Sequence, residues 1–151
     1  MRNKQFVAEH RGGLLTKDHH KELIIWACKC AENVLPLSTN KIDKRLIDAI
    51  KTAKDWTNDN ATVGDCRNAA FDAIAVANEG TNPAEVAVAR SVGHAVATAH
   101  MADHSLRASE YALKAAKLAG KSTDIEREFQ DQLLSPSIAE LVLSSRKNVK
   151  L

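Results

Sequence analysis

The sequence is poor in aromatic residues, glycine and proline, and this shortage limits the folds that it can form. Only 4% of its 151 residues are aromatic, and it contains six glycines and three prolines, whereas alanine is its commonest residue. Sheets are rich in aromatic and β-branched side chains, and alanine has the highest helix propensity, so this composition favours helices. No segment alternates apolar and polar residues for long enough to form a strand. We therefore expect an all-α protein in which residues 1–151 form a single domain.

Long hydrophobic runs and a strong excess of one charge are also absent. No apolar run approaches the roughly 20 residues that span a bilayer, and Met1–His10 lacks the apolar core of a signal peptide, so no membrane partner is expected. The net charge is only +2 and no basic stripe carries interleaved aromatic residues, which argues against nucleic acid as a partner. Cys28, Cys30 and Cys66 are odd in number and lie in helical patterns, which predicts reduced thiols and a cytoplasmic location.

Helical periodicity and capping signals divide the chain into a compact bundle of six or seven helices. Four helices are predicted from residue 16 to about 35, from 41 to 58, from 62 to 80 and from 82 to about 102. A fifth follows and ends at about 118, and two more begin at 123 and 135. A break is expected near 102–105, with Asp103 or Ser105 as a cap, because a helix from 82 to 120 would be about 55 Å long. Residues 1–15 are expected to form an irregular arm and residues 146–151 a frayed tail.

The apolar stripes of these helices predict which side chains face the core. Trp26 and Trp56 are expected to be core anchors, with the alanine-rich helices at the centre of the bundle. Cys30 is expected in the core and Cys28 outside it, because the two side chains point about 200° apart on a helix. Thr123 and Glu126 form a predicted capping box for a helix whose apolar residues Ile125, Phe129 and Leu133 are expected to face inward.

Three of the six histidines lie within the twelve residues Gly93–His104, in a run otherwise made largely of alanine, valine and threonine. Helices with such small side chains pack closely, so His94, His100 and His104 are expected to lie between helices. A buried histidine needs a hydrogen-bond partner, a metal or a ligand, or it stays neutral at some cost. Burial would lower the pKa values of these histidines, whereas contact with Asp103 would raise them.

The spacing of His100 and His104 permits a metal interpretation of this segment. On a continuous helix the two imidazoles share one face, and His-Met-Ala-Asp-His has the outline of an inverted zincin helix with Asp103 in place of glutamate. A catalytic zinc needs a third protein ligand, and none stands at an obvious spacing, so no metal is expected. If a metal were bound, His100 and His104 would be its ligands. The other interpretation is that the histidines bond backbone carbonyls or carboxylates between helices.

Arg11 precedes Gly12-Gly13 and a capped helix, a pattern that would suit either closure over an anion or simple packing. The sequence contains no glycine-rich phosphate loop, no nucleophile elbow and no supported cysteine–histidine pair. We therefore expect neither an enzyme nor a cofactor.

Several short sequence motifs, taken together, resemble those of a known family. They are His10-Arg11-Gly12-Gly13-Leu14-Leu15, residues 26–37 (Trp-Ala-Cys-x-Cys-Ala-Glu-x-Val-Leu-Pro-Leu), residues 93–104 (Gly-His-Ala-x-Ala-Thr-Ala-His-x-x-x-His), and Glu126-Arg127-Glu128-Phe129-Gln130 with Ile138 and Glu140-Leu141-Val142. The chain resembles, from about Arg11 to Val142, the helical bacterial family of "putative immunity proteins", which genomic association assigns to toxin–immunity systems. The resemblance implies an all-helical intracellular protein whose partner is another protein.

The sequence supports two functions of different classes. The first is an immunity protein that binds and neutralises a cognate protein toxin without catalysis. The sequence is also compatible with a homo-oligomer. The alternative is a small-molecule or metal-binding helical protein, or a cryptic hydrolase, that uses His94, His100, Asp103 and His104. Arg11 joins these four as a candidate binding residue.

Overall fold

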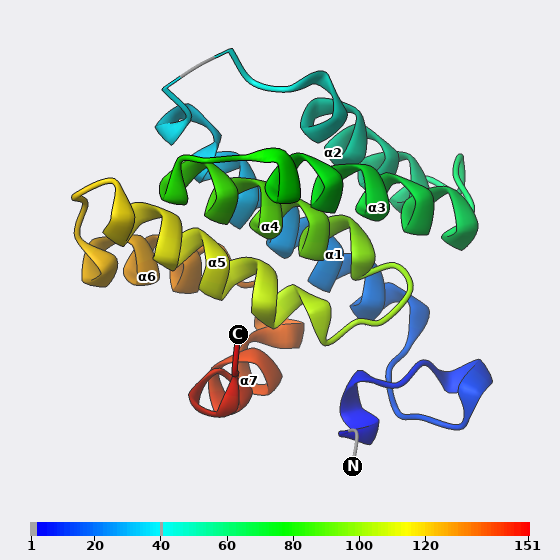
Figure 1. The fold of residues 1–151 in the computed structure, drawn as a ribbon. Helices are drawn as coiled ribbons and strands as arrows, with labels where there is room; N and C mark the ends of the chain where they lie inside the picture. Colours follow the sequence, from blue (N-terminus) through cyan, green and yellow to red (C-terminus); the bar gives the residue numbers. More distant parts are fainter. Residues whose placement is uncertain (1–2, 40) are drawn as a thin grey trace.

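The computed structural model describes residues 3–39 and 41–151 (Figure 1), so Met1, Arg2 and Asn40 of the predicted arm and linker lie outside the described residues. In this part the chain forms seven α-helices: α1 (Lys17–Val34), α2 (Lys44–Thr57), α3 (Val63–Glu79), α4 (Pro83–Ala97), α5 (His104–Leu118), α6 (Thr123–Gln132) and α7 (Pro136–Ser145). The only β-type pairing among these residues is an isolated bridge between Ala8 and Leu15. The predicted all-α bundle of six or seven helices is confirmed. No described helix is long and apolar enough to cross a membrane.

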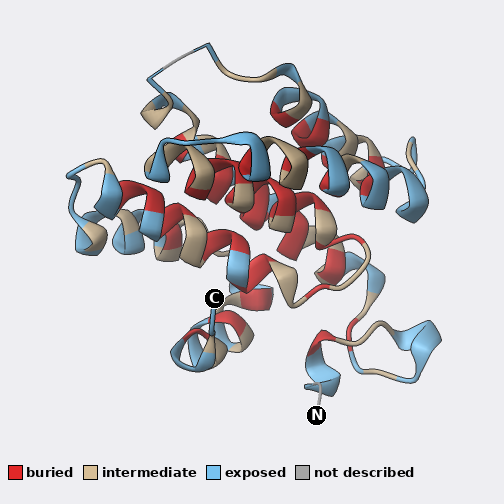
Figure 2. Cartoon of the chain, viewed as in Figure 1, coloured by how far each residue is buried: buried red, intermediate tan, exposed pale blue. Residues whose placement is uncertain are grey.

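Helix α4 lies at the centre of the bundle, where it contacts α1, α2, α3 and α5. Figure 1 shows α3, α4 and α5 side by side, with α1 behind them and α2 above. Buried residues follow α4 along its length and mark the facing sides of α1 and α5 (Figure 2). Alanine, glycine and serine at these contacts leave little side-chain bulk between the helices, so the backbones approach closely. The prediction that an alanine-rich helix occupies the centre is confirmed.

Two apolar clusters form the core, and α1 and α4 contribute to both. The first cluster lies between α1, α2, α3 and α4 and contains Trp56, and the second contains Trp26 and involves α5, α7 and the N-terminal arm. Both tryptophans are buried, as predicted. Cys28 is also buried, at 3% exposure, because α1 is covered on two sides; the expectation that it lies outside the core was wrong. All three cysteines are free thiols, and burial raises the pKa of Cys28 to about 12.

Most predicted helix starts are observed with the expected capping bonds. Thr16 accepts a hydrogen bond from the His19 backbone N–H, and Thr62 forms a complete capping box with Asp65. Two starts are corrected. Helix α2 begins three residues late because Asp43 is its N-cap, and α6 is capped by the Ser122 hydroxyl, which accepts from the Ile125 N–H.

The apolar side of α6 faces outward at two of its three predicted core positions. Ile125 is 70% exposed and Phe129 is 37% exposed, so the prediction that they face inward was wrong. Figure 2 shows α6 largely in the colours of exposed and intermediate residues. The helix is held instead by a polar side chain, because Gln130 is completely buried.

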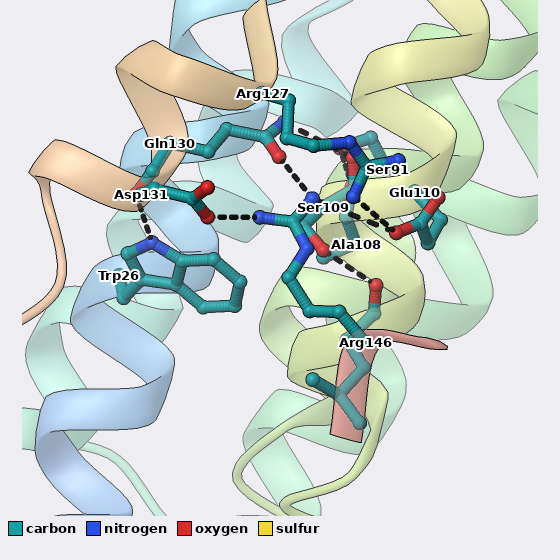
Figure 3. A network of polar contacts seen from close by, with 10 residues as sticks. Trp26, Ser91, Ala108, Ser109, Glu110, Arg127, Gln130, Asp131 and Arg146 are labelled. Carbon is teal, nitrogen blue, oxygen red and sulfur yellow. Dashed lines mark hydrogen bonds and ion pairs between the residues drawn. The ribbon is translucent and has the colours of Figure 1, made fainter. Parts of the chain in front are cut away.

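Gln130 belongs to a buried polar network that connects α1, α5 and α6 to the end of the chain (Figure 3). Its backbone carbonyl accepts a hydrogen bond from Trp26 Nε1 at 2.8 Å, and its Nε2 donates to the Ser109 carbonyl at 3.0 Å. Arg146 donates to Gln130 Oε1 at 2.6 Å and to Asp131 Oδ1 at 3.0 Å, and its guanidinium lies 5.7 Å from the Trp26 ring centre. The predicted frayed tail thus starts with a short 3-10 turn, Arg146–Asn148, whose first side chain is buried.

Candidate functional site

The helix break falls between His94 and His104 and brings these two histidines together. Helix α4 ends at Ala97, turns occupy most of 98–103, and α5 begins at His104, so the chain reverses at the right of Figure 1. The Nδ1 atoms of His94 and His104 lie 2.7 Å apart, within hydrogen-bond distance. One imidazole must therefore donate its Nδ1 proton while the other accepts it. This bond between the two histidines was not among the partners expected from the sequence.

Tyr111 extends the histidine pair into a stack of three rings. The His94 and His104 ring centres lie 4.9 Å apart at an interplanar angle of 26°, and those of His94 and Tyr111 lie 5.3 Å apart at 7°. These separations are typical of offset stacking. All three side chains are partly buried, and Lys114 Nζ lies 6.0 Å from the centre of the Tyr111 ring at the outer end of the stack.

The surroundings of His94 are positive. Burial, together with the nearby His104, Arg107 and Arg90, lowers the pKa of His94 to about 4. At neutral pH His94 is therefore an uncharged ring that stacks and hydrogen-bonds but carries no charge. Neither Arg90 nor Arg107 forms an ion pair with another residue in the described ranges, so these guanidinium groups have no carboxylate partner there.

His100 and Arg11 lie at a second place, near the N-terminal arm. They line a cavity of about 40 Å³ together with His10 and His20. His20 is buried and its Nε2 lies 2.6 Å from the Thr98 carbonyl oxygen, while its ring packs against Trp56 with centres 4.9 Å apart. Burial lowers the pKa of His20. This cavity has room for about one water molecule, not for an organic ligand.

The His94–His104 pair and the cavity beside the N-terminal arm are connected through Thr98, in the turn after α4. The Thr98 hydroxyl donates to the His94 carbonyl at 3.0 Å, while the Thr98 carbonyl contacts His20. Asp103 is the N-cap residue of α5, makes no capping bond with its side chain, and lines a groove with Arg107 and Asn148. The five candidate residues therefore do not form one cluster: His94 and His104 touch each other, and Arg11 and His100 share the cavity.

The glycines before α1 explain how the arm reaches this cavity. Gly12 has a φ of +84°, which favours glycine, and ends the short turn Glu9–Arg11. A Cβ atom on Gly13 would lie 1.9 Å from the Val7 carbonyl oxygen, so only glycine fits. The arm folds back tightly enough to bury Phe6 and Leu15 in the second core cluster.

The inverted-zincin interpretation of His100 and His104 was wrong about their geometry. His100 lies in the turn after α4 and His104 starts α5, so no continuous helix places both imidazoles on one face. Within the described ranges no three histidine, cysteine, aspartate or glutamate side chains are placed to hold a metal ion.

Sequence reasoning missed Tyr111, Arg90, Arg107 and Lys114 as members of the site. A signal was available, because His104, Arg107, Tyr111 and Lys114 recur at intervals of three and four residues and so share one face of α5. Likewise Arg90 lies one turn before His94 on α4. That the two faces meet follows only from the packing of α4 against α5.

The comparisons with known proteins place the chain in a family. A family model described as "Imm-5 like putative immunity protein" matches residues 13–137. The chain belongs to this family, because the match covers far more than half of it and includes α1 through α6. The resemblance inferred from the sequence is thus confirmed. A search of the curated proteins and a search of the solved structures each find nothing that matches this chain.

Proposed function

We propose that this protein is an immunity protein that binds a cognate protein toxin and neutralises it by contact, without catalysing a reaction. The observation that carries the proposal is the family match over residues 13–137. Neutralisation by contact needs a complementary surface with a few energetically dominant residues, and aromatic and arginine side chains are the usual ones. The proposed contact residues are His94, His104 and Asp103 around the helix break, with Arg11 and His100 beside the arm.

Two features of the candidate site suit a binding role. The rings of His94, His104 and Tyr111 are stacked and the two histidines are hydrogen-bonded to each other, so little side-chain entropy is lost when a partner covers them. The small cavity beside Arg11 and His100 is too small for a substrate, which favours a packing or partner-contact role for these residues. A catalytic function would need a nucleophile or general base in a roomy pocket.

The experiment first asks whether a toxin gene lies beside the gene for this protein. It then titrates this protein into a fixed amount of that toxin and measures the residual toxin activity. Contact inhibition predicts that activity falls linearly and ends at a fixed stoichiometric ratio, with a stable complex in size-exclusion chromatography. Protection at far less than one protein per toxin would instead indicate catalytic inactivation. Absence of both complex and protection would refute the proposal.

A further inference from the structure

Three rings and three cations lie on α4 and α5, and we name this group of side chains the ring face. It consists of His94, His104 and Tyr111, with Arg90, Arg107 and Lys114 around them. Arg107 and Lys114 are exposed, and the other four are partly buried. The three rings are fixed by stacking and by the 2.7 Å contact between the histidine Nδ1 atoms. The ring face is therefore preorganised and accessible.

The charges of the ring face distinguish it from the sites of Arg45, Arg127 and Arg146. Arg45 bonds Asp43 and Glu79, Arg127 is paired with Glu110, and Arg146 is paired with Asp131. No such carboxylate accompanies Arg90 or Arg107 among the described residues. Two guanidinium groups that act on His94 and have no ion-pair partner there offer donors to carboxylate oxygens from outside the chain.

We propose that the ring face docks an acidic, carboxylate-bearing segment of a protein partner, with Arg90 and Arg107 as the residues that bind the carboxylates and the rings as the apolar contact. The inference rests on the proposed function in one respect, that the partner is the toxin. A protein partner fits better than nucleic acid, because the chain has 19 acidic residues, a net charge of +2 and no extended basic track along which a phosphate backbone would run. The partner's acidic segment would supply carboxylates to Arg90 and Arg107.

A carboxylate at the ring face would also change the titration of His94. The charged and titratable groups that act on His94 are Arg90 on its own helix and His104 and Arg107 on α5, with Tyr111 in ring contact. All of the charges among them are positive, and they oppose protonation of His94. A bound carboxylate would compensate for them and raise the pKa of His94 above its value in the free protein. A merely structural stack would show no such change.

The experiment measures binding of a fluorescein-labelled peptide of ten glutamates by fluorescence anisotropy at low salt. The test variant is the double substitution Arg90→Glu and Arg107→Glu. The matched control is Lys29→Glu and Lys147→Glu, two exposed lysines outside the ring face that make the same change in net charge. We expect the test variant to bind at least about tenfold more weakly than the unmodified protein and the control to stay within about twofold. Thermal unfolding of each variant verifies that it is folded; if the double variant unfolds, Arg90→Gln and Arg107→Gln take its place.

Three results would overturn the inference: no binding of the glutamate peptide, an equal loss in test and control variants, or binding of a single-stranded DNA of equal charge that is as tight as that of the peptide. An unchanged pKa of His94 in the peptide complex, followed by NMR, would also contradict it. The toxin titration separates the two proposals. A toxin that binds the unmodified protein and the Arg90→Glu, Arg107→Glu variant equally well would overturn this inference alone, whereas a toxin that neither protein binds would refute the proposed function and leave the peptide comparison as the test of the ring face.

Discussion

His94, in the last turn of α4, and His104, the first residue of α5, share a hydrogen bond between their Nδ1 atoms, which lie 2.7 Å apart. Such a bond requires one ring that carries a proton on Nδ1 and another whose Nδ1 carries none, so that its proton is on Nε2, the commoner form in free histidine. We therefore predict that NMR of ¹⁵N-histidine-labelled protein at pH 7.5 shows one ring of this pair in the Nδ1–H form. Two Nε2–H rings at these positions would contradict the pairing.

Burial of His94 and His20 should make the protein less stable in mild acid. The pKa of His94 is lowered to about 4, so between pH 6.5 and 4 the unfolded chain binds more protons than the folded one. The contribution of His94 is complete above about pH 6.5 and is lost as the pH falls toward 4. We expect the free energy of unfolding in urea to drop by about 1–2 kcal/mol from pH 7.5 to pH 5.0, after allowance for solvent screening of a partly exposed ring.

The variant that tests this pH effect is His94→Gln. It should reduce the difference in stability between the two pH values, because it removes the ring whose pKa is lowered. Equal or greater stability of the unmodified protein at pH 5.0 would mean that the histidines are not held neutral. An ion pair of His100 or His104 with Asp103 would then be the better explanation.

Gly13 and Gly64 provide a matched pair of glycine-to-alanine substitutions. At Gly13 the new Cβ would lie 1.9 Å from the Val7 carbonyl oxygen, so Gly13→Ala must displace the arm and should cost about 2 kcal/mol or more. At Gly64, in the first turn of α3, the nearest atom would be 3.6 Å away, so Gly64→Ala should stabilise the protein by about 0.5–1 kcal/mol. Urea denaturation measures both, and a neutral Gly13→Ala would show that the arm tolerates a different path.

Arg146 should contribute far more to stability than its neighbour Lys147. Arg146→Ala removes a buried guanidinium that contacts Gln130, Asp131 and Glu110, and leaves their oxygens without that partner. We expect a loss of about 2–4 kcal/mol and a shift in the fluorescence of Trp26, which lies against the guanidinium. Lys147→Ala, at an exposed position, should stay within about 0.5 kcal/mol. Equal effects of the two substitutions would mean that the tail is not anchored.

The features that the sequence by itself determined are those that depend on neighbouring residues. Alanine content, periodicity and capping side chains act within one or two helical turns, so the helices, the caps at Thr16 and Thr62 and the existence of a break between residues 82 and 118 could all be predicted. Both tryptophans were predicted as core residues because each lies on a single apolar stripe of its helix.

What only the tertiary structure decided are the contacts between residues distant in the chain. The place of the break, after Ala97 instead of near 102, paired His94 with His104 and left His100 beside His20 and Arg11. The packing of α6 buried Gln130 under Arg146 and left Ile125 exposed, although its apolar stripe predicts the reverse. The physical reason is that the apolar periodicity of a helix specifies which side chains share a face. Which other helix covers that face depends on how all the helices pack together around the core.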